Sequence, residues 1–276
     1  MHFSFPDGNA VRINCPDSAS LLSQVRTRLS RGQGFALATI NVDHLQRLAE
    51  DAAFRRAYAA QDLVCADGNP IVWLSRLAGS PVQLAPGSDL VLPLAAEAAG
   101  LGLPVALIGS SAESLALAAR AMQDRVPGLT VALTHAPGFP FDPDGEEGAQ
   151  IIDRIRASGA RLCFLALGAP RQERFAVFAA RALPQTGFAS VGAGLDFLAG
   201  LQKRAPAAVR GAVPPYAIRA LAVDHHPAAI GLDPGPLFST RTYLTLYPDI
   251  AAAGVNPLGH YLHYGAPEGR LPNLLE

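Results

Sequence analysis

The sequence predicts an α/β fold, a Rossmann-like parallel sheet with helices on both faces. Between residues 35 and 191, short apolar runs alternate with amphipathic stretches of helical length. This alternation is typical of βαβ units, whose parallel strands are buried on both faces. The chain has 276 residues, of which 50% are hydrophobic and 16% charged, a balance that excludes an intrinsically disordered protein.

Each predicted element is bounded by ordinary strand or helix signals. We expect strands at 35–40, 63–66, 105–108, 130–133, 162–167 and 187–191. We expect helices at 43–58, 70–77, 88–99, 112–125, 146–157 and 172–182. Asp43 is the expected N-cap of the first helix, and Pro70 suits the first turn of the second.

The composition changes near residue 205 and again near residue 236. The stretch 205–215 is rich in alanine and proline, and 231–236 has the glycines and prolines of a linker. The tail holds four of the six tyrosines, together with His260 and His263, which we expect to be packed or solvated histidines. We therefore predict a core at 1–205, a connecting region at 206–235 and a small, mainly helical module at 236–276.

Charge and hydropathy limit the partners and the compartment. A net charge of −1 provides no basic field for nucleic acid or anionic lipid. The N-terminus lacks the pattern of a signal peptide, and the apolar stretch 90–108 is broken by Glu97 and two prolines, so we expect no membrane-spanning helix. Three widely spaced cysteines indicate buried, reduced thiols of a cytoplasmic protein.

Ligands of open parallel sheets bind beyond the carboxyl ends of the strands, so polar residues there are the site candidates. Thr39 and Asn41 follow the first core strand and suit a sugar, although a helix cap also explains part of this segment. Asp67 follows the next strand, where partial desolvation would make its carboxylate more basic, as a general base requires. The spacing alone favours a turn or cap for Asp67 and for the neighbouring Asn69.

Three further segments suit a phosphorylated ligand. Gly109 and Ser110 end a strand before a helix, a geometry that presents free N–H groups to an anion, although a capped helix explains it equally well. Gly168, Arg171, Gln172 and Glu173 follow a fully apolar strand and form a dense polar set. The last segment contains Gly194 and Asp196, and then Lys203 and Arg204, which suit a diphosphate or simply a solvated turn.

Taken in order, these segments resemble the WecB/TagA/CpsF family of bacterial glycosyltransferases. The resemblance covers about residues 35–210 and is most specific in Gly168-Ala169-Pro170-Arg171-Gln172-Glu173 and in Gly194-x-Asp196-Phe197-x-Ala199-Gly200. The other matching segments are Thr39-x-Asn41, Ala66-Asp67-Gly68, Gly87-Ser88-Asp89-Leu90, Leu107-Ile108-Gly109, Gly138-Phe139 and Arg204-Ala205-Pro206.

The resemblance implies an inverting, metal-independent transfer of a sugar from a UDP-sugar to a polyprenyl-diphosphate-linked saccharide in exopolysaccharide, capsule or cell-wall polymer synthesis. It implies no cofactor, a peripheral location at the inner face of the plasma membrane, and a chain compatible with a homo-oligomer. Its general base falls on Asp67, and its acceptor side on Thr39, Asn41, Asn69 and Asp89. Its nucleotide-sugar side falls on Gly109, Ser110, Gly138, Phe139, Gly168, Arg171, Gln172, Glu173, Gly194, Asp196 and Arg204.

The chain also departs from the family pattern. Leu84 stands where members usually carry an arginine. Members also carry several arginines after the position of Arg204, and in this chain only Arg219 corresponds to one of them. These departures leave open a second function, that of a non-catalytic UDP-sugar-binding partner in polysaccharide assembly, although Asp67 is kept. A nucleotide-binding oxidoreductase is disfavoured, because no dinucleotide fingerprint follows any of the strands.

Overall fold

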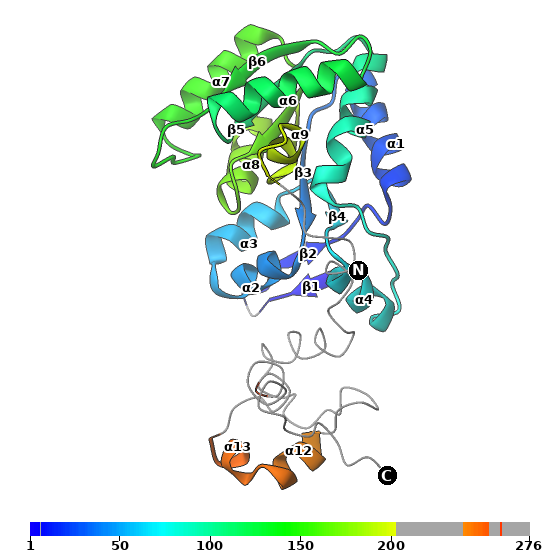
Figure 1. The fold of residues 1–276 in the computed structure, drawn as a ribbon, viewed down its shortest axis with the longest axis vertical. Coiled ribbons are helices and arrows are strands. Elements are labelled where there is room, and N and C mark those ends of the chain that lie inside the picture. The colour runs from blue at the N-terminus through cyan, green and yellow to red at the C-terminus, as the bar shows by residue number, and fades with distance from the viewer. Residues whose placement is uncertain (6, 203–239, 254–259, 261–276) are drawn as a thin grey trace. The chain divides into compact units, whose positions relative to one another are not determined.

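The predicted α/β class is confirmed by the computed structural model, which describes residues 1–5, 7–202, 240–253 and 260. The chain divides into two compact units, Met1–Ala205 and Pro206–Glu276. The first unit holds a six-stranded parallel sheet in the order β4-β3-β8-β7-β5-β6 and a two-stranded antiparallel sheet of β1 and β2 (Figure 1).

The strands of the large sheet lie where the apolar runs predict them, within two residues at each end. They are β3 (Phe35–Ile40), β4 (Leu63–Ala66), β5 (Val105–Gly109), β6 (Val131–His135), β7 (Leu162–Ala166) and β8 (Gly187–Ser190). The central strands are buried along almost their whole length, and their residues are mostly apolar, because helices cover both of their faces. β6 at the edge alternates between half-buried and exposed residues, which explains its weaker sequence signal.

Alternate residues of each strand enter different hydrophobic clusters on the two faces of the sheet. Leu107 and Phe164 pack in a cluster with residues of α1 (Ser18–Ser30), α5 (Gly87–Gly100) and α6 (Ala112–Arg125). Ile108 and Leu165 pack on the opposite face, with residues of α7 (Glu146–Ser158) and α8 (Arg171–Ala182). At the β4 end of that opposite face, a third cluster includes residues of α2 (Val42–Glu50), α3 (Ala52–Ala59) and α4 (Asn69–Leu77).

The side on which the crossing helices lie follows from the direction in which the chain crosses the sheet. The connections that move toward β6 cross on α5 and α6 on one face, whereas those that move toward β4 cross on α2, α3, α7 and α8 on the other. α4, the short first helix of the connection from β4 to β5, packs on that other face before the chain crosses on α5. All crossovers therefore have the same hand, as expected for parallel sheets. α9 (Gly194–Leu198) follows β8 and contacts α5 and α6.

The prediction of one helix at 43–58 with Asp43 as its N-cap is wrong. Asn41 caps α2, and the chain breaks at Asp51 before α3 begins. The Asp51 backbone is extended, and its carboxylate accepts hydrogen bonds from the backbone N–H groups of Ala53 (2.8 Å) and Phe54 (2.9 Å). A second N-cap inside an amphipathic pattern thus divides the helix in two.

The sequence did not predict α1 or the hairpin of β1 (His2–Ser4) and β2 (Ala10–Arg12). The hairpin contributes Val11 to the third cluster, and the buried Arg55 of α3 holds the hairpin in place through Asp7. The Arg55 guanidinium donates to Asp7 Oδ2 (2.6 Å) and to the carbonyls of Leu48 (2.6 Å) and Ala49 (3.1 Å). The first of these hydrogen bonds holds the pKa of Asp7 below its usual value.

The three cysteines are free and buried, as expected. Within the part of the chain that the structure describes, no helix combines the length and the apolar composition needed to cross a membrane.

Of the second unit, the structure describes α12 (Thr240–Leu246), α13 (Pro248–Ala253) and His260. Tyr243 is fully buried, and its hydroxyl lies 3.1 Å from His260 Nδ1, so His260 is a packed histidine there. His263 lies outside the described residues. The boundary predicted between a connecting region (206–235) and a module (236–276) stays a prediction.

We expect Arg55→Met to lower the free energy of unfolding by about 2–3 kcal/mol, because a buried and a half-buried carbonyl group at the end of α2 lose their charged donor. Urea unfolding followed by circular dichroism measures this change. Arg56→Met is the matched control, because Arg56 is the exposed next residue of the same helix. Equal effects of the two substitutions would contradict the role given to Arg55.

Candidate active site

Every sequence segment chosen as a site candidate within the described residues follows a strand of the large sheet or starts the next helix. Because the strands are parallel, these segments meet at one edge, beyond the carboxyl ends of the strands. Along this edge the segments succeed one another in the order of the strands, from Asp67 after β4 to Gly138 after β6.

At the end of β3 and β4, the structure brings Thr39 and Asp67 together. The Thr39 hydroxyl donates to Asp67 Oδ2 at 3.2 Å, and the Asp67 backbone N–H donates to the carbonyl of Ile40 at 2.8 Å. Thr39 is 6% exposed, whereas Asp67 is half-buried. The N-cap of α4 is Gly68, with no side-chain cap, so the prediction that Asp67 caps this helix is wrong, whereas the prediction of a turn stays a prediction. The carboxylate of Asp67 is thus held at the carboxyl edge of the sheet.

The other residues predicted for the acceptor side surround this pair. Asn41 uses its side-chain oxygen to cap α2, accepting from the backbone N–H of His44 at 2.9 Å, so the capping interpretation holds for it. Asn69 begins α4, two residues after Asp67. Asp89 is exposed in the first turn of α5, whose Gly87 approaches Thr39 so closely that an added Cβ would lie 3.3 Å from Thr39 Oγ1.

After β5, the structure joins two predicted residues that are far apart in sequence. Asp196 Oδ1 of α9 accepts hydrogen bonds from the hydroxyls of Ser110 and Ser114. Gly109 has a φ of +112°, and a Cβ there would lie 2.4 Å from the carbonyl oxygen of Ala166, so only glycine fits beside β7. Ser111 caps α6, and the Ser110 hydroxyl connects the turn to α9 through its hydrogen bond to Asp196.

Sequence reasoning missed Ser114. It lies in the first turn of α6, whereas Ser110 precedes the N-cap with a φ of +54°, so helical spacing does not relate the two hydroxyls. Their common partner, Asp196, is apparent only in the folded chain.

Gln172 and Glu173 at the start of α8 are buried, at 3% and 0% exposure. The Gln172 amide donates to Glu173 Oε1 (2.8 Å) and accepts from the backbone N–H of Gly192 (3.3 Å), so it connects α8 with the loop after β8. Burial raises the pKa of Glu173 to about 7, and its Oε2 has no hydrogen-bond partner among the described residues. A direct contact between these side chains and a nucleotide would require them to become exposed.

The remaining predicted residues occupy the neighbouring loops. Gly168 precedes α8 with a φ of +71°, and Arg171 is half-buried at the first position of that helix. Gly194 begins α9 and packs against α5. Arg204 lies outside the described residues, as does Lys203.

The loop between β6 and α7 presents Phe139, which is 90% exposed. Its neighbour Gly138 donates its backbone N–H to Glu147 Oε1 at 2.7 Å. The loop is anchored by Phe141, whose ring packs edge-on against Phe175 at 6.1 Å, and by Arg174, which contacts the carboxylates of Asp142 and Asp144. The aromatic side chain is thus held in solvent by a loop with fixed ends.

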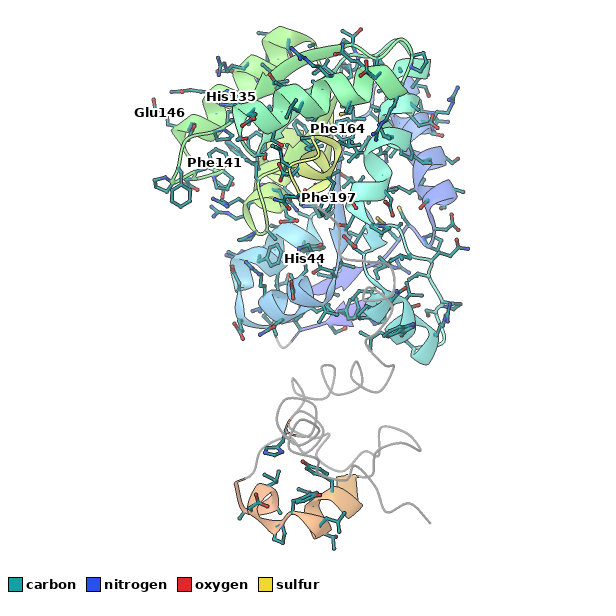
Figure 2. The ribbon with its side chains drawn as sticks, in the orientation of Figure 1. His44, His135, Phe141, Glu146, Phe164 and Phe197 are labelled. Atoms are coloured by element: carbon teal, nitrogen blue, oxygen red, sulfur yellow. The ribbon has the colours of Figure 1, made fainter. Side chains whose placement is uncertain are left out.

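A cavity of about 240 Å³ lies beside α9 rather than at Asp67. It is lined by Ser88, Arg125, Gly194, Phe197, Leu198 and Gln202 (Phe197 is labelled in Figure 2). Only Gly194 belongs to the predicted site, so this cavity does not by itself mark the position of the chemistry. Among the described residues there is no group of three or more histidine, cysteine, aspartate or glutamate side chains placed to hold a metal ion.

A parallel α/β sheet with its polar groups gathered beyond the carboxyl ends of the strands is typical of proteins that bind nucleotides and sugars. A comparison with protein families gives a closer assignment. The model of the glycosyl transferase WecG/TagA/CpsF family matches residues 9–222, and the chain therefore belongs to this family of glycosyltransferases in polysaccharide synthesis. The resemblance found in the sequence is confirmed.

The pKa of Glu173 predicts a pH-dependent stability. A carboxyl whose pKa is higher in the folded chain stabilises the fold fully below its unfolded value of about 4.5, and this contribution is lost as the pH rises through about 7. Between these values the wild type is expected to lose up to about 3 kcal/mol relative to Glu173→Gln. Urea unfolding across this pH range measures the difference.

Glu113→Gln serves as the control, since Glu113 is an exposed carboxylate at the start of α6. Its stability should follow that of the wild type at every pH. Parallel curves for the wild type and Glu173→Gln would show instead that Glu173 is ionised in the folded protein throughout the range.

Proposed function

We propose that the protein is an inverting, metal-independent glycosyltransferase that moves a sugar from a UDP-sugar to a polyprenyl-diphosphate-linked saccharide. The observation that carries this proposal is the pairing of Thr39 with the half-buried carboxylate of Asp67 at the carboxyl edge of the sheet. The family assignment supports the transfer of a sugar, and the donor and acceptor classes follow from the sequence resemblance.

In the proposed reaction, Asp67 acts as the general base. An acceptor hydroxyl gives its proton to the carboxylate while its oxygen bonds to C1 of the donor sugar, on the face opposite the UDP group. The bond from C1 to the diphosphate oxygen breaks, and UDP leaves with the bonding electron pair. Because the entering oxygen replaces the leaving oxygen from the opposite face, the configuration at C1 is inverted.

The spacing of the site suits an extended donor. Two strands, β8 and β7, separate β3 from β5, which places Thr39 at the end of β3 about 14 Å from the Ser110 turn along the sheet edge. Asp67 follows β4, the next strand beyond β3. We place the reacting carbon near Asp67 and the nucleotide near Ser110 and Asp196. Free N–H groups at the start of α6, together with Arg171, are the described donors for the charge that develops on UDP.

The second candidate is a non-catalytic partner that binds a UDP-sugar. Leu84 favours it: its bridge to Ala66 places it beside Asp67, where it is 41% exposed and provides no cation. For the transferase, an acceptor carried by a polyprenyl lipid would bring the protein to the inner face of the plasma membrane as a peripheral protein. A homo-oligomer is compatible with both candidates.

We expect Asp67→Asn to reduce sugar transfer by about 10²-fold or more and to leave UDP affinity within about twofold of wild type, because the amide cannot accept the proton. A panel of UDP-sugars with a lipid-linked acceptor, in the presence of EDTA and read by mass spectrometry, measures transfer. Calorimetry measures UDP binding. Asp124→Asn, at an exposed aspartate of α6, is the control.

Undiminished turnover by Asp67→Asn would remove Asp67 as the base. If the wild type binds UDP but turns over no donor with any acceptor in a broad panel, the non-catalytic function replaces the enzymatic one.

Asp196→Asn tests the nucleotide side. The substitution weakens the acceptor that holds Ser110 and Ser114, and we expect the affinity for UDP to fall about tenfold. Calorimetric titration with UDP, with Asp153→Asn on α7 as the surface control, measures the change. An unchanged affinity would place the nucleotide elsewhere.

A further inference from the structure

The ladder between β3 and β8 ends before β3 does. The two strands pair from Phe35–Gly187 to Leu37–Ala189, and then they part. The backbone N–H of Gly192, the next donor on the β3 side after that of Ser190, goes instead to the side-chain oxygen of Gln172 at 3.3 Å. The end of β3 therefore lacks a strand partner on its β8 side.

This parting leaves the carbonyl group of Thr39 without a ladder partner. The carbonyls of Ala36 and Ile40 point to β4, where they accept from the backbone N–H groups of Asp62 (2.9 Å) and Asp67 (2.8 Å). Because successive carbonyls of a strand point in opposite directions, that of Thr39 points toward β8. Thr39 is almost fully buried, so an unpaired carbonyl there would be costly.

Two side chains, one from α2 and one from α3, form hydrogen bonds with this carbonyl. The Tyr58 hydroxyl donates to the Thr39 oxygen at 2.6 Å, and His44 Nδ1 lies 2.9 Å from both the Thr39 oxygen and the Tyr58 hydroxyl. An N–H on Nδ1 satisfies both contacts, which assigns that tautomer of the neutral ring. Both lone pairs of the Thr39 carbonyl are thus used.

The two donors are held rigidly by aromatic packing. The ring of Phe54 meets Tyr58 edge-on at 5.2 Å and His44 edge-on at 5.9 Å (His44 is labelled in Figure 2). Burial raises the pKa of Tyr58 well above its ordinary value, with Glu173, Cys65 and Asp67 adding to the effect, so the hydroxyl remains a donor.

Burial likewise lowers the pKa of His44, whose nearest charged groups are Asp43 and Arg47 on its own helix. The imidazole therefore stays neutral, as the assigned tautomer requires.

From this arrangement we propose that Tyr58 and His44 are positioning residues of the sugar transfer: by holding the Thr39 carbonyl where β3 leaves β8, they fix the Thr39 hydroxyl against the carboxylate of Asp67. The inference rests on the proposed function for its bearing on catalysis. Its structural part, the coupling of Tyr58 to Asp67 through Thr39, is independent of activity. Thr39 connects the two sides, because its carbonyl accepts from the Tyr58 hydroxyl and its own hydroxyl donates to Asp67.

The coupling is tested by the ¹³C carboxyl titration of Asp67, identified by the loss of its signal in Asp67→Asn. Tyr58→Phe removes one hydroxyl and keeps the aromatic ring. The loss of the hydroxyl loosens the hydrogen bond from the Thr39 hydroxyl to Asp67, and this hydrogen bond is the one that favours the charged carboxylate. We expect the titration midpoint to move up by about half a pH unit, from the partial loss of one hydrogen bond. His44→Leu should move it in the same direction.

Two controls separate positioning from general destabilisation. Leu48→Ala removes buried apolar contacts from the same cluster and should lower the melting temperature without moving the midpoint. In the Thr39→Val background, Tyr58→Phe should have no further effect on the midpoint, because the connecting hydroxyl is absent. An unchanged midpoint in both Tyr58→Phe and His44→Leu, or an equal shift in Leu48→Ala, overturns the coupling.

Turnover then tests the role in catalysis. We expect kcat for sugar transfer to fall about tenfold in Tyr58→Phe with KM for the donor unchanged, since the donor site is not touched. A fall in stability alone, with normal kcat per folded molecule, overturns the positioning role. If the wild type transfers no sugar, the proposed function fails, and with it the catalytic role of the pair, whereas the titration still decides the coupling.

Discussion

The burial of the large sheet on both faces is the constraint on which the rest of the structure depends. Helices cover the central strands so completely that residues such as Leu107 and Phe164 have no exposed surface. Polar side chains placed on those faces would lose their hydration without gaining partners, so they collect at the carboxyl edge, where the strands end. The one-handed crossovers send some of the following helices to one face and some to the other, and the edge between them stays accessible.

The sequence is sufficient to predict what depends on local pattern. The six strands of the large sheet appear as apolar runs, and Thr39, Asp67, Ser110 and Asp196 are identifiable because each lies at or just beyond a predicted element. The break at Asp51 was not predicted, since the apolar pattern continues through it and only the cap ends the helix. Tyr58 was not recognised either, because its partner carbonyl is unpaired only through the parting of β3 from β8, a property of the assembled sheet.

The site is held together mostly by hydrogen bonds that cross between elements rather than by ion pairs. Asp196 joins α9 to the turn after β5, Gln172 joins α8 to the loop after β8, and Thr39 joins β3 to the residue after β4. Each of these contacts fixes one loop relative to another strand, so the edge is organised before any ligand arrives. A site built in this way needs little rearrangement on binding, which lowers the entropic cost of holding two substrates together.

The environments of two carboxyl groups explain why we propose Asp67, and not Glu173, as the general base. A general base must contact the hydroxyl from which it takes the proton, and it must be ionised when it does so. Glu173 is fully buried, its nearest hydrogen-bond donor is the neutral amide of Gln172, and its raised pKa keeps a large share of it protonated near neutrality. Asp67 is half-buried at the sheet edge, and its carboxylate accepts a hydrogen bond from Thr39 that favours the charged form. Two acids of similar intrinsic strength therefore differ because of their surroundings: Glu173 lies in the interior, whereas Asp67 lies at the surface, where a substrate can reach it.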